Sequence, residues 1–238
     1  MPADDIPGVV VTGAAGGIGA AVAREAVGRG CRVLALVRQP PADPSVLDFP
    51  GVHVCPSDVS RQDAGDAVTR ALAKSGISRV GVLVNAAGIV RHGTRLASTS
   101  ADDVLESLNV HCVGALRVTR ACLPALLRAP RPAVLNLTSR HGSLALASAG
   151  GVQGVEVSYA YRIAKAAQNM LTACLHQELA PRVRVLAVHP GRVSTAIAPA
   201  DADRSPAEAA RHLLDLAENA PQEWSGRFVE PPSTFLKW

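Results

Sequence analysis

A glycine cluster that follows an apolar run near the N-terminus constrains the fold most. Residues 9–12 are a β-branched run, glycines follow at Gly13, Gly17 and Gly19, and residues 20–28 have an alanine-rich helical pattern. This order predicts a strand, a tight turn and a helix. Glycines at such a turn let the backbone approach a pyrophosphate, which amide groups and the helix dipole then stabilise. Because the G-x-x-x-G-x-G spacing differs from the G-x-G-x-x-G dinucleotide fingerprint, a plain strand-to-helix turn is the alternative interpretation.

Further apolar runs continue along the chain, with helical patterns between them. The expected strands are residues 9–12, 32–37, 52–55, 80–85, 133–138, 183–188 and 227–230. Such alternation, with right-handed crossovers, gives a doubly wound parallel sheet whose ligands bind beyond the carboxyl ends of the strands. We therefore expect an α/β fold of Rossmann type, with about seven strands, helices on both faces and a single domain over residues 1–238.

Tyr161 and Lys165 are four residues apart in a helical stretch, which places them as neighbours on one face. A tyrosine has a pKa of about 10, so proton exchange near neutrality requires its pKa to fall by roughly 3 units. A nearby ammonium favours this fall because it stabilises the phenolate. The pair therefore suggests proton transfer, whereas the spacing alone is also compatible with a solvated helix face. Tyr159 is six residues before Lys165 and is turned away from it.

Six motifs, taken in order, resemble the motif set of the short-chain dehydrogenases/reductases. They are Thr12-Gly13-x-x-x-Gly17-Ile18-Gly19, Asn85-Ala86-Ala87-Gly88, Asn109, Ser139, Tyr161-x-x-x-Lys165 and Pro190-Gly191-x-Val193-x-Thr195. The resemblance covers essentially the whole chain. Within the family, residues 159–162 and the short C-terminal region are similar to the sniffer-type carbonyl reductase and C-factor group.

The resemblance implies four catalytic residues, Asn109, Ser139, Tyr161 and Lys165. Tyr161 would exchange the proton, and Asn109 would hold a water that links Lys165 to solvent. Ser139 ends a buried strand, where its hydroxyl can polarise a substrate carbonyl rather than attack it. The alternatives are Thr138 in place of Ser139 and an exposed helix asparagine at position 109.

The resemblance also implies a dinucleotide site. Its expected contacts are Gly13, Ala15, Gly16, Gly17, Ile18, Arg38, Asp58, Val59, Asn85, Ala86, Ala87, Gly88, Tyr161, Lys165, Pro190, Gly191, Val193 and Thr195. Arg38 follows the second strand, where an acid would accept hydrogen bonds from the ribose of NAD and a guanidinium can bind a 2′-phosphate. NADPH or NADP is therefore expected, and NAD is less favoured. A surface arginine is the rival interpretation, because Gly16 supplies no second basic residue.

Ser139 and Tyr161 are 22 positions apart, which is more than is usual in the family. Residues 142–157 therefore resemble an insertion, and we expect them to border the substrate pocket, with a surface excursion as the alternative. Only residues 196–204 separate Thr195 from the next helical pattern, which leaves little chain for a lid. The pocket is therefore expected to be open.

The composition excludes several classes of protein. Hydrophobic residues make up 48% and charged residues 18% of the chain, which is typical of a globular protein with buried strands. The acidic N-terminus and the absence of an apolar run of about 18 residues favour a cytoplasmic location without a membrane span. Five scattered cysteines indicate core residues in a reducing compartment, with neither disulfides nor a metal site. A net charge of +4 from dispersed arginines argues against nucleic-acid binding.

These observations favour an NADPH-dependent oxidoreductase that reduces a ketone or aldehyde, or runs the reverse reaction on an alcohol. A catalytically silent NADP-binding regulatory protein is the main alternative. A sugar epimerase or dehydratase of the extended branch would need a sizeable C-terminal domain. The substrate is a small molecule that the sequence does not identify, and a homodimer or homotetramer is expected by resemblance.

Overall fold

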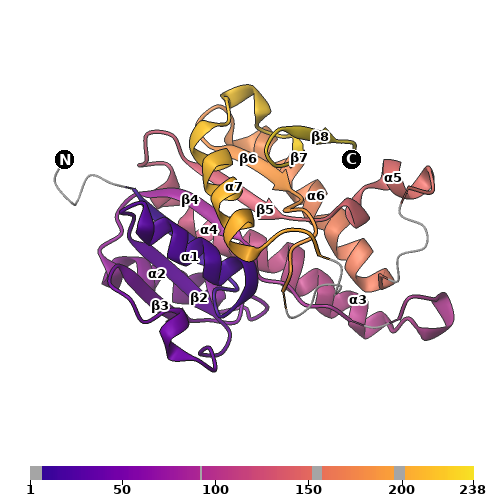
Figure 1. Cartoon of the computed structure of the whole chain (residues 1–238), viewed down its shortest axis with the longest axis horizontal. Helices are drawn as coiled ribbons and strands as arrows, with labels where there is room; N and C mark the ends of the chain where they lie inside the picture. Colours follow the sequence, from indigo (N-terminus) through magenta and orange to yellow (C-terminus); the bar gives the residue numbers. More distant parts are fainter. Residues whose placement is uncertain (1–6, 92, 152–156, 196–201) are drawn as a thin grey trace.

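The computed structural model describes residues 7–91, 93–151, 157–195 and 202–238. All seven expected strands form, each with boundaries within one residue of the expectation, and an eighth joins them (Figure 1). The strands are β1 (Gly8–Thr12), β2 (Val33–Val37), β3 (Val52–Pro56), β4 (Val80–Asn85), β5 (Ala133–Leu137), β6 (Arg184–Val188), β7 (Phe228–Glu230) and β8 (Thr234–Leu236).

The sheet has the order β3-β2-β1-β4-β5-β6-β7-β8. Neighbouring strands from β3 to β7 are parallel, whereas β8 is antiparallel to β7. The sequence did not predict β8, because Thr234 and Phe235 are exposed and the strand has no buried apolar pattern. The strand order reverses between β1 and β4, which is where folds of this type place their ligand crevice.

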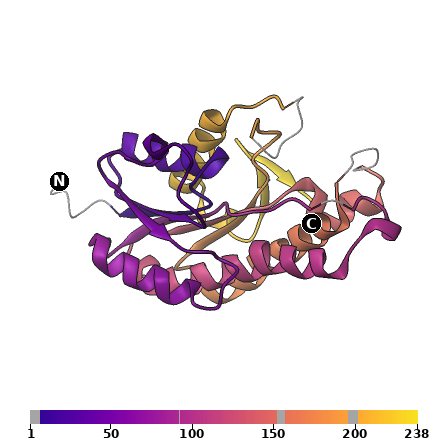
Figure 2. The same cartoon turned by 90° about the horizontal axis from the view of Figure 1, so that it is seen from below.

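Two helical layers cover the sheet (Figure 2). Helices α1 (Gly17–Gly28) and α7 (Pro206–Asn219) pack on one face, and α2 (Ala64–Ser75), α4 (Gly114–Leu126) and α6 (Tyr159–Leu179) pack on the other. The side chains of Val9 and Val11 enter the first core, while that of Val10 enters the second. Strands buried on both faces explain why the sequence shows continuous apolar runs rather than alternation.

The segment that carries Asn109 is not a regular α-helix. Helix α3 (Ala101–Leu108) leads into a π-helical segment, Asn109–Val113, which continues directly into α4. A short helix, α5 (Leu144–Ser148), lies in the segment that resembles an insertion. Among the helices of the described residues, none is long and apolar enough to cross a bilayer.

The cysteines differ in their exposure. Cys55 and Cys122 are core residues as expected, and Cys31 and Cys112 are half-buried. The expectation is wrong for Cys174, which is exposed. It lies on α6, a helix with both buried and exposed faces, and the apolar neighbours in the sequence do not distinguish them.

Candidate active site

The turn between β1 and α1 requires glycine. Gly13 and Gly17 have φ angles of +69° and +53°, in the left-handed region that favours this residue. A Cβ on Gly13 would lie 2.9 Å from the Cα of Ala87, and one on Gly19 would lie 2.3 Å from the carbonyl oxygen of Gly13. The exposed backbone of Gly16 and Gly17 stands at the N-terminus of α1, a place suited to a phosphate.

The end of β4 is fixed beside this turn. The hydroxyl of Thr12 accepts hydrogen bonds from the backbone amides of Ala86, at 3.0 Å, and Ala87, at 2.9 Å. The side chain of Asn85 is buried, and its Nδ2 donates to Oδ1 of Asn136 at 2.8 Å. Asn85 thus braces β4 against β5 with its side chain. Residues 86–88 follow it beside the turn.

The segment after β6 returns to the same turn. A Cβ on Gly17 would lie 3.2 Å from Cγ2 of Thr195. Buried Val193 forms an isolated parallel bridge with Arg204, whose Nη1 donates to the carbonyl oxygen of Pro190 at 2.7 Å. The predicted segments after β1, β4 and β6 therefore meet at one edge of the sheet, as a dinucleotide site requires.

The residues expected near the adenosine end lie beyond β2 and β3. Arg38 is exposed directly after β2. The carboxylate of Asp58 accepts hydrogen bonds from Ser60, at 2.9 Å from its amide and 2.7 Å from its hydroxyl. Burial raises the pKa of Asp58, but these bonds and the charge of Arg38 outweigh it and leave the pKa below its ordinary value. Val59 is buried beside it.

Helix α6 presents Tyr161 and Lys165 together, as their spacing predicts. The hydroxyl of Ser158 caps the helix by accepting from the amide of Tyr161. The Nζ of Lys165 lies 5.5 Å from the centre of the Tyr161 ring. It donates to the carbonyl oxygen of Leu137, at 2.5 Å, and to Oε1 of Gln168, at 2.9 Å. The ammonium is thus held between α6 and the end of β5.

The electrostatics of this pair differ from the expectation. Burial raises the pKa of Tyr161, and the nearby hydroxyl of Ser139 offsets this only in part. Burial also lowers the pKa of Lys165 to about 7. The expectation of a lowered tyrosine pKa is therefore wrong for this arrangement. Lys165 faces the Tyr161 ring and donates its hydrogen bonds to Leu137 and Gln168, while desolvation disfavours the phenolate.

The hydroxyls of Ser139 and its neighbour Thr138 have different partners. The hydroxyl of Thr138 donates to Oδ1 of Asn169 at 2.6 Å, so it ties β5 to α6. The hydroxyl of Ser139 instead accepts from the backbone amide of His141 and lies near the Tyr161 phenol. Of the two hydroxyls, that of Ser139 is therefore the one that lies beside Tyr161, and its catalytic role stays a prediction.

The side chain of Asn109 bonds to two other segments of the chain. Its Nδ2 donates to the carbonyl oxygen of Ser60 at 2.9 Å, and its Oδ1 accepts from Nη1 of Arg117 at 2.8 Å. Within the described ranges, its side chain makes no hydrogen bond to Lys165. Asn109 thus ties the π-helical segment to the loop after β3, and its role in a water relay stays a prediction.

Sequence reasoning missed His111, which contacts Tyr161. The buried His111 ring meets the Tyr161 ring edge-on, and its Nε2 lies 2.9 Å from the carbonyl oxygen of Ile89. Burial and the charge of Lys165 lower the pKa of His111 to about 3, so the ring is neutral near pH 7. The only sequence signal was its place two residues after Asn109, and the π-helical segment sets the direction of its side chain.

Comparisons with known proteins agree with this geometry. The family model described as short chain dehydrogenase matches residues 8–205. A 1-hydroxy-2-glutathionyl-2-methyl-3-butene dehydrogenase from Rhodococcus sp. (strain AD45) is 32% identical over 97% of this chain and 99% of its own. C-signal from Myxococcus xanthus is 35% identical over 67% of this chain and 93% of its own.

A solved structure shows the same fold. NADPH-bound carbonyl reductase from chicken fatty liver superposes with a TM-score of 0.87 at 24% identity, over 98% of this chain and 99% of that one. The matched residues of the family model include every catalytic residue that the motifs predict. The chain belongs to the short-chain dehydrogenase family.

Proposed function

We propose that this protein is an NADPH-dependent oxidoreductase that reduces a ketone or aldehyde to an alcohol, or runs the reverse reaction. The observation that carries the proposal is the meeting of Ser139, Tyr161 and Lys165 at the sheet edge where the glycine turn lies. Membership in the family supports an oxidoreductase, and the chicken carbonyl reductase with NADPH supports the carbonyl and cofactor classes.

The residues present fit a dinucleotide. The glycine turn leaves no room for side chains at Gly13 and Gly19, whereas a Cβ on Gly16 would meet nothing within 4 Å. Residues 13–18 would hold the pyrophosphate, Asp58 and Val59 the adenine, and residues 86–88 and 190–195 the nicotinamide half. When bound, the nicotinamide supplies the hydride equivalent that the protein itself cannot provide.

Arg38 is the residue that favours NADP over NAD. It is exposed after β2, and among the described residues its guanidinium has no hydrogen bond or ion pair. An acid at this place would accept from a free ribose hydroxyl, whereas a guanidinium donates to a 2′-phosphate. The charges of Asp58 and Arg38 act on each other, and this attraction would orient Arg38 beside the adenosine.

The side chains have separate tasks in the reduction. Ser139 donates a hydrogen bond to the substrate carbonyl oxygen, which stabilises the charge that develops there. Tyr161, whose raised pKa keeps it protonated, donates the proton to that oxygen. Lys165, with a pKa of about 7, can gain or lose a proton near neutrality and would restore the proton of Tyr161.

A turnover assay tests the proposal. The purified protein is mixed with NADPH and a panel of ketones and aldehydes, and the loss of NADPH absorbance is followed. We expect oxidation of NADPH that depends on the carbonyl compound and that Ser139→Ala and Tyr161→Phe reduce. Tight binding of NADPH without turnover of any panel member would instead favour the silent regulatory protein.

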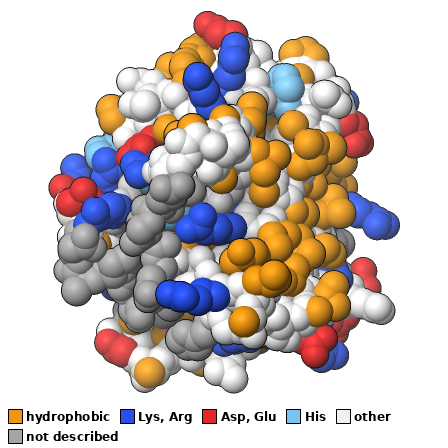
Figure 3. Space-filling model, turned by 90° about the vertical axis from the view of Figure 1, so that its right-hand side faces the viewer, with side chains coloured by type: hydrophobic (Ala, Val, Ile, Leu, Met, Phe, Trp, Pro, Cys, Tyr) orange, Lys and Arg blue, Asp and Glu red, His pale blue; other side chains and the backbone are white. Residues whose placement is uncertain are grey.

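We also propose that the enzyme forms a homodimer through α3, α4 and α6. Figure 3 shows hydrophobic side chains gathered at the end of the molecule that carries α3, α5 and α6. Leu105 of α3, Leu116 of α4, and Ile163 and Met170 of α6 are exposed, as is Val113 of the π-helical segment between α3 and α4, and α3 packs beside α6. Such apolar surface is typical of an interface. Light scattering of the wild type and Met170→Glu, with Arg70→Glu as control, would test this.

A further inference from the structure

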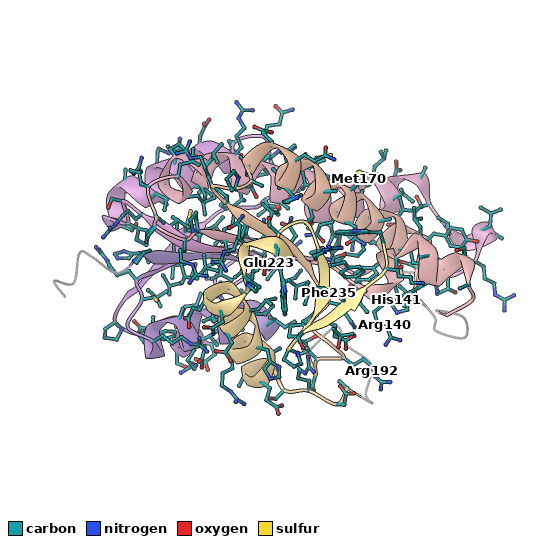
Figure 4. All side chains as sticks on the ribbon, turned by 90° about the horizontal axis from the view of Figure 1, so that it is seen from above. Arg140, His141, Met170, Arg192, Glu223 and Phe235 are labelled. Atoms are coloured by element: carbon teal, nitrogen blue, oxygen red, sulfur yellow. The ribbon has the colours of Figure 1, made fainter. Side chains whose placement is uncertain are left out.

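Two arginines and a histidine lie near the strand end that carries Ser139. Arg140 and His141 follow it directly, in the turn Arg140–Gly142, and Arg192 follows β6, the neighbour of β5. Figure 4 shows these three residues at the same end of the molecule. The sequence has no Asp or Glu within residues 139–151 or 189–195. The two segments that flank the candidate catalytic residues are therefore positive or neutral throughout.

The turn that carries Arg140 is fixed against the catalytic helix. A Cβ on Gly142 would lie 2.6 Å from the carbonyl carbon of Lys165, so the turn packs directly on α6. The Nδ2 of Asn169 donates to the carbonyl oxygen of Gly142 at 3.1 Å. The backbone that carries Arg140 is thus held in place relative to α6, so that a ligand has to order only the arginine side chain and not the turn.

The charges act on one another across the gap between the two strand ends. Burial, together with the charges of Arg140, His141 and Arg204, lowers the pKa of His189, directly after β6, to about 3. Burial also lowers the pKa of His141, together with Arg162 and Arg140. None of these shifts has a carboxylate among its causes. The cationic side chains Arg140, Arg162 and Arg204 therefore act on this region from three segments of the chain, while Glu208 faces Arg204 and Asp203 lies beside Arg192.

Arg140 is placed to meet a ligand. It is exposed, and within the described part of the chain its guanidinium makes no hydrogen bond or ion pair. Its neighbour His141 has a buried Nδ1 without a hydrogen-bond partner there. A guanidinium donates paired hydrogen bonds to carboxylate or phosphate oxygens, and a positive cleft concentrates anionic substrates.

We propose that the substrate carries an anionic group, a carboxylate or a phosphate, which Arg140 and Arg192 bind while the carbonyl lies at Ser139 and Tyr161. This inference rests on the proposed reductase function and specifies its substrate class. Arg140 and Arg192 come from two adjacent strand ends, so an anion between them fixes which end of the substrate enters the site.

Matched pairs of substrates test the proposal. Levulinate is compared with methyl levulinate, and dihydroxyacetone phosphate with dihydroxyacetone, in steady-state kinetics with NADPH. We expect the anionic member of at least one pair to have a KM about ten-fold lower, which corresponds to about 1.4 kcal/mol. The pair that shows the difference identifies the anion as carboxylate or phosphate.

Variants assign the effect to the two arginines. Arg140→Gln and Arg192→Gln should each raise the KM of the preferred anionic substrate about ten-fold. The kcat, and the KM of the matched neutral substrate, should change much less. Arg70→Gln, which removes an exposed arginine on α2, should keep the wild-type ratio. Equal KM values within both pairs, or a ratio that neither site variant changes, would overturn the proposal.

A direct binding measurement tests the anion site independently of the proposed reductase activity. Calorimetry with the NADP-saturated protein measures the affinity for levulinate and for dihydroxyacetone phosphate, and circular dichroism checks that each variant is folded. If no carbonyl is reduced but Arg140→Gln weakens anion binding, the reductase function fails and the anion site stands. If neither anion binds, or if both site variants bind as the wild type does, the anion site is wrong.

Discussion

The ring of His111 stands edge-on to the ring of Tyr161, with centroids 5.5 Å apart and planes at 90°. The same histidine lies over Gly88, where a Cβ would come within 2.7 Å of its Cε1. It therefore packs between the end of β4 and Tyr161, and it joins two segments that the sequence motifs treat as separate.

We predict that His111 contributes to the loss of stability in acid. Its pKa is lowered to about 3 in the folded state, against an ordinary value of about 6.5, so the unfolded state binds more protons between these values. The stability that the neutral ring contributes is present above pH 6.5 and is lost as the pH falls toward 3. His111→Phe should make urea midpoints less dependent on pH in this window, whereas His53→Gln should not.

Tyr161→Phe should abolish most of the turnover. The change keeps the ring and its contact with His111 but removes the proton, and positioned acid catalysis contributes about 10² to 10⁴ in rate. We expect kcat to fall by at least about 10², with NADPH binding nearly preserved in a fluorescence titration. Tyr159→Phe is the matched control. Because Tyr159 is 42% exposed, this substitution should lower kcat much less. Near-normal reduction by folded Tyr161→Phe would refute the mechanism.

Arg38→Asp should change the cofactor preference. Loss of charge-assisted hydrogen bonds costs about 1.5–3 kcal/mol, so NADPH affinity should fall by about ten- to a hundred-fold. NADH affinity should change far less, because NADH has no 2′-phosphate. Arg70→Asp introduces the same charge change on α2 and should leave the ratio as it is. A wild type that prefers NADH in binding titrations would contradict the assignment.

Arg117→Met tests the role of Asn109. If Asn109 acts by holding the loop at Ser60, loss of Arg117 should weaken NADPH binding several-fold and lower stability by about 0.5–1.5 kcal/mol, because both residues bond to that loop. The kcat at saturating NADPH should stay near the wild-type value. A fall in kcat with unchanged NADPH affinity would favour the proton relay over the structural role.

Shortening of residues 142–157 should change the substrate preference and leave NADPH affinity largely intact. The described part of this segment is tied to the C-terminus, since Ser143 donates its hydroxyl to the carbonyl oxygen of Lys237 at 2.7 Å. Deletion of Lys237 and Trp238 should therefore alter relative rates in the same direction. Unchanged relative rates over a carbonyl panel, in a folded deletion variant, would place the segment away from the pocket.

The sequence by itself determined the strands, the glycine turn and the pairing of Tyr161 with Lys165. These features are local, because strand burial appears as continuous apolar runs and a four-residue spacing places two side chains on one helix face. The sequence also predicted that the motifs after β1, β4 and β6 lie at one edge of the sheet, since parallel strands share their carboxyl edge, and the structure brings these segments together there.

Only the tertiary structure decided the remaining features. Strand β8 depends on pairing with β7 rather than on its own pattern, and Asn109 meets Ser60 across 49 residues of sequence. The direction of the Tyr161 pKa depends on burial by elements far apart in the chain. Desolvation is a property of everything packed around a group, whereas the spacing of two residues on a helix reports only their mutual position.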